Sequence, residues 1–133
     1  MKIIVDTSVW SLALRRGDIR SHPCVDELRG LIHDHRVQMI GPIRQEILSG
    51  IRSKSQFHNL RRHLESFPDL PLLTDDYVEA AGYFNLCRSK EIQASNTDFL
   101  ICAVSVRSEM PIYTTDKDFE SFAEHIPICF HKA

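Results

Sequence analysis

Four acidic residues stand at positions where they could hold one metal ion together. They are Asp6, Glu46, Asp98 and Asp116. Two carboxylates about 5 Å apart repel each other by about 3 kcal/mol at an effective dielectric constant of roughly 20. A site that gathers four carboxylates is therefore expected to take up a proton or to bind a divalent cation. Because the set contains only oxygen donors, it favours a hard ion, Mg²⁺ or Mn²⁺.

The chemistry that such a site supports is the hydrolysis of a phosphodiester bond. A bound divalent ion lowers the pKa of a water molecule, positions it for in-line attack and neutralises charge on the phosphate. The sequence shows no Ser–His–acid arrangement at plausible positions, no Walker phosphate loop and no GxGxxG motif after the first predicted strand. Serine-type covalent catalysis and dinucleotide binding are therefore disfavoured.

Each acid also has a purely structural explanation. Asp6 begins an Asp-Thr-Ser run of good helix caps, and Glu46 could lie on a solvated helix face. Asp98 could favour the positive end of its helix, and Asp116 and Asp118 could be ordinary turn or cap residues. These explanations do not account for the convergence of the acids that the predicted topology brings about.

The predicted elements alternate between short strands and longer helices. Strands are predicted at 2–5, 37–40, 70–73, 111–114 and 128–130. Helices are predicted at 8–15, 26–35, 42–51, 54–66, from Thr74 or Asp75 to Lys90, from a cap at Asn96 or Thr97, and at 118–124. Strands separated by helices predict an α/β fold of three layers, α/β/α, around a mostly parallel sheet of four to five strands. With 133 residues, the chain is expected to form one domain, 1–133. Ligands of such sheets bind at the carboxyl ends of the strands, where all four acids are expected.

Composition favours a globular protein that stays off membranes. Hydrophobic residues make up 43% and charged residues 26% of the chain, and the formal net charge is −2. Overall charge therefore does not indicate a nucleic-acid binder. No apolar run approaches the roughly 20 residues needed to cross a bilayer, and the start of the chain lacks the pattern of a secretory signal. We therefore expect a cytoplasmic protein.

The four cysteines form no CxxC pair, and we expect reduced thiols. Cys129, in the run IPICF, is predicted to be a small buried hydrophobe. One zinc set is conceivable, made of His22, Cys24, Cys129 and His131. Its two-residue spacing is not the usual geometry of a zinc finger, so a zinc site is disfavoured.

A local basic stretch could bind the backbone of RNA. It comprises Arg44, Arg52, Lys54, Arg61 and Arg62, and it begins beside Glu46. Weaker candidates near the end of the first predicted strand are Arg15, Arg16 and Arg20. A solvated helix face is an equally good explanation of the stretch. No ladder of aromatic residues accompanies these charges, so base stacking is not predicted.

Four segments together resemble the PIN-domain nucleases, and most of all the VapC-type toxins of bacterial toxin–antitoxin pairs. The segments are IIVDTSVW, PIRQEIL, TDFLICAVS and YTTDKDF, in the order and spacing of that family. The resemblance covers about residues 1–130 and implies a PIN-like fold with Asp6, Glu46, Asp98 and Asp116 as the acidic site. It further implies Asp118 as an additional acid, Thr7 or Ser8 as a group that orients Asp6, and Thr114 or Thr115 near Asp116. Asn96, two residues before Asp98, is a less usual neighbour in that family, and we expect it to be a supporting donor.

The resemblance also implies an activity and partners. Such toxins are Mg²⁺- or Mn²⁺-dependent endoribonucleases that cleave structured RNA, commonly transfer RNA or ribosomal RNA. They usually form homodimers, and a small cognate antitoxin silences them by lying over the groove of the helices that span about 43–66 here.

Two other functions remain as alternatives. A non-catalytic module of the same fold could bind RNA or a protein through the basic stretch, although a binder has no reason to tolerate four mutually repelling acids. A phosphotransfer receiver or phosphatase would need an acidic neighbour for Asp6 and a lysine after a further strand. Lys117 is instead adjacent to Asp116. The receiver is therefore the weaker alternative.

Overall fold

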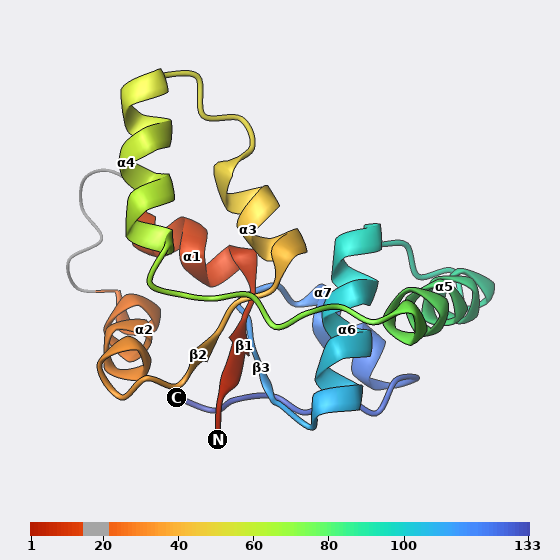
Figure 1. Cartoon of the computed structure of the whole chain (residues 1–133). Coiled ribbons are helices and arrows are strands. Elements are labelled where there is room, and N and C mark those ends of the chain that lie inside the picture. The colour runs from red at the N-terminus through yellow and green to blue at the C-terminus, as the bar shows by residue number, and fades with distance from the viewer. Residues whose placement is uncertain (15–21) are drawn as a thin grey trace.

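The computed structural model describes residues 1–14 and 22–133, and its centre is a parallel sheet of short strands (Figure 1). β1 (Ile3–Val5) lies between β2 (Val37–Gln38) and β3 (Ile112–Tyr113). All three residues of β1 are fully buried. A central parallel strand is covered on both faces, which explains why β1 is a continuous apolar run without alternation.

Helices cover both sides of this sheet. They are α1 (Thr7–Leu14), α2 (Pro23–His33), α3 (Gly41–Leu48), α4 (Lys54–Leu64), α5 (Thr74–Ser89), α6 (Asn96–Ser108) and α7 (Asp118–Ala123). In Figure 1, α1 and α2 lie on one side of the strands, and α5, α6 and α7 lie on the other. α1 packs against α2 and α3, and α5 packs along α6. The predicted α/β fold with a covered parallel sheet is confirmed.

The sheet has fewer full strands than the sequence predicts. In place of the predicted strand 70–73 there is a single parallel bridge between Met39 and Asp69, and in place of 128–130 a single bridge between Ile112 and Phe130. Prolines 68 and 71 flank the first bridge, and proline 127 precedes the second. Because proline lacks a backbone N–H, these segments cannot extend the hydrogen-bond ladder. The sheet therefore has three strands in the described residues, with one bridge at each edge.

Local caps shift several predicted helix starts. Ser95, and not Asn96 or Thr97, caps α6 with its side chain. α2 begins at Pro23, earlier than predicted, with the His22 ring accepting a hydrogen bond from the Cys24 amide. Proline is favoured in the first turn of a helix because its missing N–H is not needed there.

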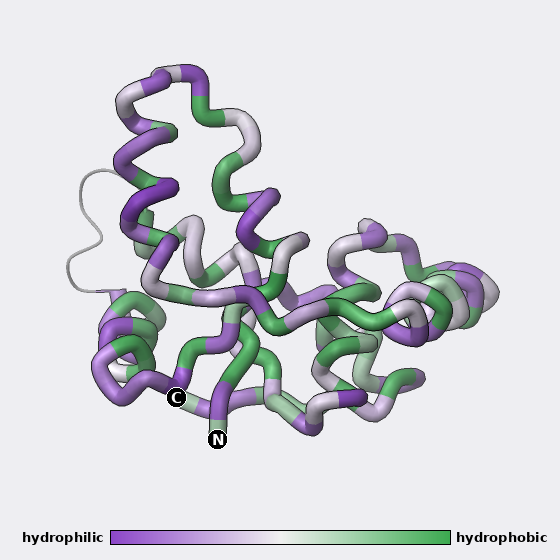
Figure 2. The backbone as a smooth tube through the Cα atoms, in the orientation of Figure 1, coloured by the Kyte–Doolittle hydropathy of each residue, from purple (hydrophilic) through white to green (hydrophobic). Residues whose placement is uncertain are grey.

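The core holds α6 and α7 firmly against the sheet. Phe99, Phe119 and Phe122 are fully buried, and the ring centroids of Phe99 and Phe122 lie 5.2 Å apart. Burying each of these rings contributes about 1.5–3 kcal/mol. In Figure 2 the central strand runs through hydrophobic residues, whereas hydrophobic and hydrophilic residues alternate along the helices. Among the described residues, no helix combines the length and apolar character that a membrane crossing requires.

Candidate active site

Asp6 stands where β1 ends and α1 begins. Its backbone N–H donates to the Tyr113 carbonyl over 2.9 Å, so β1 and β3 stay paired up to this residue. The side chain is only 4% exposed. Its Oδ2 atom accepts hydrogen bonds from the hydroxyls of Ser8 (2.7 Å) and Thr114 (2.8 Å). These neutral donors stabilise the buried carboxylate without cancelling its charge.

The same two hydroxyls shape the chain that leaves β3. Thr114 Oγ1 accepts from the Asp116 amide, and Ser8 Oγ accepts from the Thr115 amide, each over 3.0 Å. A hydroxyl has one proton, and both protons here point to Asp6. The 3.2 Å contact between the two hydroxyls is therefore not a further hydrogen bond. Asp6 thus fixes the position of Asp116 through Thr114.

Asp98 lies in the first turn of α6 and forms a reciprocal cap with Ser95. The Asp98 amide donates to Ser95 Oγ (3.1 Å), and the Ser95 amide donates to Asp98 Oδ2 (3.3 Å). Burial raises the pKa of Asp98 to about 6. The charges of Asp6 and Asp116 add to the rise, against opposing hydrogen bonds from Ser95. The three aspartates therefore interact electrostatically, although they come from three distant segments.

Glu46 joins the group from α3. The Thr7 hydroxyl donates to Glu46 Oε1 over 2.6 Å, which ties α3 to the residue that follows Asp6. Asp116 Oδ1 accepts from the Asp118 amide over 2.9 Å. Asp118 itself is exposed and is the first residue of α7. All four predicted acids thus belong to the segments that leave the carboxyl ends of the strands or begin α6.

No cation of the described chain neutralises this group. In residues 1–14 and 22–133, no Lys, Arg or His forms an ion pair with Asp6, Glu46, Asp98 or Asp116. Each of these carboxylates has one oxygen in a hydrogen bond with the protein: Asp6 with Ser8 and Thr114, Glu46 with Thr7, Asp98 with Ser95, and Asp116 with Asp118. The second oxygen of each carboxylate forms no hydrogen bond with the protein in residues 1–14 and 22–133.

The donor set fits a hard divalent cation, but the side chains do not stand in a finished coordination shell. Among the described residues, no three His, Cys, Asp or Glu side chains are arranged to hold an ion as they stand. The carboxylates supply only oxygen donors, which Mg²⁺ and Mn²⁺ prefer. Binding an ion would therefore require side-chain rotation, for which the second oxygens are available.

The supporting residues differ in part from the predicted ones. Thr7 contacts Glu46, and Ser8 orients Asp6. Thr114 supplies the hydroxyl near Asp116, whereas Thr115 contributes its backbone amide. The donor beside Asp98 is Ser95, while the predicted Asn96 forms no side-chain hydrogen bond within the described chain. The S-x-x-D spacing of a capping box was the signal in the sequence that could have identified Ser95.

Arg44 is a structural residue and not a free RNA-binding residue. Its guanidinium donates twice to Asp69 Oδ1 (3.1 and 2.9 Å) and also to the carbonyls of Leu64 (3.0 Å) and Phe67. It therefore ties α3 to the end of α4 and to the segment that follows it. Together α3 and α4 form an arm that stands out from the sheet, called here the α4 arm (Figure 1). The other predicted basic residues are exposed and without an ion pair in the described residues: Arg52, Lys54, Arg61 and Arg62.

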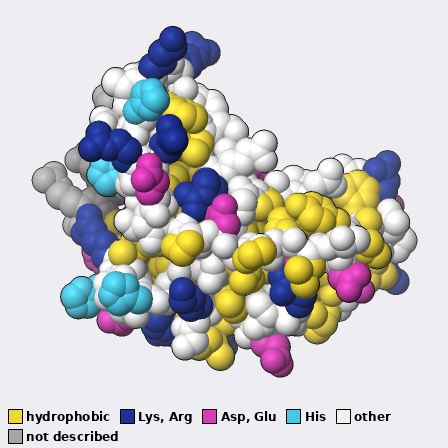
Figure 3. Space-filling view, in the orientation of Figure 1, with side chains coloured by type: hydrophobic (Ala, Val, Ile, Leu, Met, Phe, Trp, Pro, Cys, Tyr) yellow, Lys and Arg dark blue, Asp and Glu magenta, His cyan; other side chains and the backbone are white. Residues whose placement is uncertain are grey.

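Figure 3 shows Lys, Arg and His side chains gathered over the α4 arm. The weaker candidates Arg15, Arg16 and Arg20 lie outside the described residues.

The conceivable zinc set is not formed. His131 Nε2 pairs with Glu27 Oε2 at 2.5 Å, and His22 caps α2. Cys129 is exposed, so the prediction of a buried thiol there is wrong. Cys24, His22, Cys129 and His131 thus serve separate local roles.

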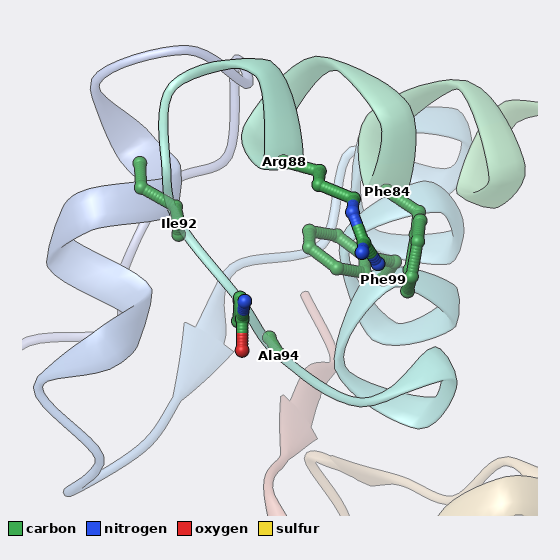
Figure 4. A pocket seen from close by; sticks show the side chains of 6 residues that line it. Phe84, Arg88, Ile92, Ala94 and Phe99 are labelled. Atoms are coloured by element: carbon green, nitrogen blue, oxygen red, sulfur yellow. The ribbon is translucent and has the colours of Figure 1, made fainter.

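Two hollows differ in their relation to the acids. One, of about 370 Å³, is lined in part by Thr114 and Asp116. Figure 4 shows the other, of about 220 Å³, where Phe84 and Arg88 of α5 and Phe99 of α6 meet the loop 92–94. The lining of this second hollow contains no acid, so it is separate from the acidic group.

Comparisons with known proteins agree with this architecture. The family model of the PIN domain matches residues 3–125. The VapC ribonuclease Mb1587 of Mycobacterium bovis and the ribonuclease VapC11 of Mycobacterium tuberculosis are each 33% identical to this chain over 128 residues, with 91% of this chain and of each relative covered.

Two crystal structures share the fold at low sequence identity. FitAcB from Neisseria gonorrhoeae has a TM-score of 0.75 at 18% identity, covering 98% of this chain and 96% of that chain. VapBC2 from Rickettsia felis, bound to a DNA fragment from their promoter, has a TM-score of 0.76 at 14% identity and covers 98% of both chains. Because the family model matches residues 3–125 and the mycobacterial relatives are 33% identical, this chain belongs to the PIN domain family.

Proposed function

We propose that this protein is a metal-dependent endoribonuclease and the toxin of a toxin–antitoxin pair, with residues 1–133 as one nuclease domain. The observation that carries the proposal is the gathering of acids at the carboxyl end of the sheet, where Thr114 links Asp6 to Asp116 and no cation in the described residues pairs with them. The names of the mycobacterial relatives, both ribonucleases, support it.

The proposed roles follow from the contacts of each acid. Asp6, Asp98, Asp116 and Glu46 would hold Mg²⁺ or Mn²⁺, with Asp118 as a further oxygen donor. The bound ion would supply Lewis-acid stabilisation of charge on the scissile phosphate. Ser8 and Thr114 hold Asp6 by Oδ2 and leave Oδ1 for the ion. Thr7 holds Glu46 at Oε1, which leaves Oε2 for the same ion.

We assign the substrate contact to the exposed cations of the α4 arm. Arg61 and Arg62 lie in the last turn of α4, and Arg52 and Lys54 lie where the arm turns. Contacts of this kind bind phosphates without reading sequence. The proposed substrate is structured RNA, transfer RNA or ribosomal RNA, in which single-stranded loops expose the bond that is cut.

The proposed partners are an antitoxin and a second copy of the chain. The groove beside α3 and α4 is the proposed antitoxin site, and the VapBC2 structure with promoter DNA supports such a pairing. Exposed apolar side chains on and beside α5 support self-association, because Leu73, Tyr77, Val78 and Leu86 are 38–63% exposed. Figure 3 shows hydrophobic side chains on the side of the molecule where α5 lies. Val78→Asp should convert a dimer to a monomer in light scattering.

Cleavage of purified transfer and ribosomal RNA tests the activity. We expect cleavage with Mg²⁺ or Mn²⁺, none in EDTA, and nearly none for Asp98→Asn with either metal. The matched control is Asp75→Asn, which changes an exposed acid in the first turn of α5. Full activity of Asp98→Asn would refute the proposal. RNA retention in a mobility-shift assay without cleavage under any metal would instead identify a binding module.

A further inference from the structure

The hollow beside Asp116 extends the acidic group along the edge of the sheet. It has a volume of about 370 Å³, and its walls include Thr114, Asp116, Lys117, Phe130 and His131. Thr114 and Asp116 belong to both the acidic group and this hollow, so the two are continuous. The volume lies within the range of pockets that bind small ligands, about 300–1,000 Å³.

His131 is held in a fixed orientation in the wall of this hollow. Its Nε2 atom pairs with Glu27 Oε2 at 2.5 Å, and its ring stands edge-on to the Tyr113 ring with centroids 5.2 Å apart. The side chain is 12% exposed. Its Nδ1 atom has no hydrogen-bond partner within the described residues, so this nitrogen is available to a ligand in the hollow.

Two further lining residues suit the two halves of a nucleotide. Lys117 is exposed, forms no ion pair in the part of the chain that the structure describes, and stands next to Asp116. A lysine so placed can bind a phosphate as a point charge. Phe130 is half-buried and offers an aromatic surface. Unstacked RNA bases commonly lie on such rings.

We propose that this hollow binds one nucleotide of the RNA substrate, next to the bond that is cut. The base lies against Phe130 and within reach of His131 Nδ1, and Lys117 holds the adjoining phosphate. The position of this subsite along the substrate rests on the proposed ribonuclease function. Nucleotide binding as such does not, because the hollow and its lining are independent of cleavage.

Binding is tested first without catalysis. The four nucleoside 5′-monophosphates are titrated in EDTA at millimolar concentrations, and backbone amide shifts are followed by NMR. We expect shifts confined to residues 112–117 and 130–131. Lys117→Gln and Phe130→Leu should each weaken binding about tenfold, the effect of one lost contact. Lys90→Gln and His33→Gln, at exposed positions on other elements, should leave it unchanged.

Cleavage of a short RNA library, with the ends sequenced, is the second measurement. Lys117→Gln should raise KM with little change in kcat, and Phe130→Leu and His131→Gln should alter the nucleotide preference at one position beside the cut. If all three variants have the KM of the parent and produce the same RNA ends, the subsite proposal is refuted and the nuclease proposal stands. If nucleotides bind in this hollow but the protein cleaves no RNA, the nuclease proposal is refuted and the nucleotide-binding site stands. Absence of shifts at these amides would overturn the subsite.

Discussion

The Thr114 hydroxyl donates a 2.8 Å hydrogen bond to Asp6 Oδ2 and so links residues 108 positions apart in the chain. The same oxygen accepts from the Asp116 amide. One small side chain therefore sets the positions of two acids, one at the exit of β1 and the other at the exit of β3. Thr114 is a positioning residue of the proposed active site.

Replacing Thr114 by valine keeps the shape of the side chain and removes both hydrogen bonds. A hydrogen bond to a charged group is worth about 1.5–3 kcal/mol, so we expect kcat for RNA cleavage to fall about 10- to 100-fold. Thr114→Ser keeps the hydroxyl and should retain most activity. Thr74→Val, at an exposed position on α5, is the control. Equal kcat for Thr114→Val and the parent would contradict this role.

Asp98→Asn should stabilise the metal-free protein at neutral pH. The pKa of Asp98, raised by burial and by the charges of Asp6 and Asp116, is about 6, against 3.8 as the ordinary value of an aspartate. The folded state therefore binds this proton more tightly than the unfolded chain, and ionisation costs stability above pH 6. This cost declines as the pH falls from 6 and is absent below 3.8.

Urea unfolding in EDTA measures this effect. We expect Asp98→Asn to raise the free energy of unfolding by about 1 kcal/mol near neutral pH, a value discounted for partial exposure, and by almost nothing near pH 3.5. The control Asp75→Asn should show no such pH dependence. A gain that is the same at both pH values would contradict the assignment.

The ion pair between Asp76 and Arg107 should stabilise the packing of α5 on α6. Arg107 Nε and Nη2 donate to the two oxygens of Asp76 over 2.7 and 2.9 Å. Burial alone would raise the pKa of Asp76, but the hydrogen bonds from Arg107 and the Leu73 amide outweigh it and lower this pKa. The stabilisation is therefore present above the unfolded pKa and is lost as the pH falls through the lower, folded value.

We expect Arg107→Met to lower the free energy of unfolding by about 3 kcal/mol near pH 7, because it leaves a buried charge without its partner. The difference from the parent should shrink below about pH 4. The exposed pair Arg29–Asp26, at 3.6 Å, supplies a matched control. Arg29→Gln should change stability by less than about 0.5 kcal/mol. Equal effects of the two substitutions would show that burial of Asp76 is unimportant.

Substitution of Arg61 should affect RNA binding, whereas substitution of Arg44 should affect thermal stability, although both residues belong to the predicted basic stretch. In an Asp98→Asn background, Arg61→Gln should weaken RNA binding and reduce the slope of log affinity against log salt by about 0.7–0.9. Arg44→Gln should instead lower the melting temperature, because it releases Asp69 and two carbonyls. An unchanged salt slope for Arg61→Gln would remove α4 from the proposed RNA surface.

The order of elements and the acidic group could be predicted from the sequence because both depend on local patterns. Apolar runs mark β1 and β3, and the carboxyl ends of parallel strands must meet at one edge. The lengths of the outer strands could not be read from apolar character alone, since the 70–73 segment lacks a backbone donor at Pro71. The two edge bridges show that backbone donors, and not hydrophobicity, limited the sheet.

The hydrogen-bond partners of individual side chains could not be predicted from the sequence. Arg44 has the same local context as the exposed arginines, and only the path of the chain after α4 brings Asp69 to it. Thr114 and Thr115 are likewise indistinguishable in a TTD turn. Strand alternation decides which hydroxyl faces Asp6, and it requires the register of β3 against β1.

The short edges of the sheet also affect how copies of this protein meet. A long, flat outer strand presents a row of unpaired amides and carbonyls on which another molecule can build. Here the Met39 carbonyl accepts a hydrogen bond from the Leu70 amide, and Ile112 exchanges hydrogen bonds with Cys129 and His131, with a single bridge at each flank. In the part of the chain that the structure describes, neither flank presents a long row of free backbone groups, which disfavours fibril-like growth from this sheet.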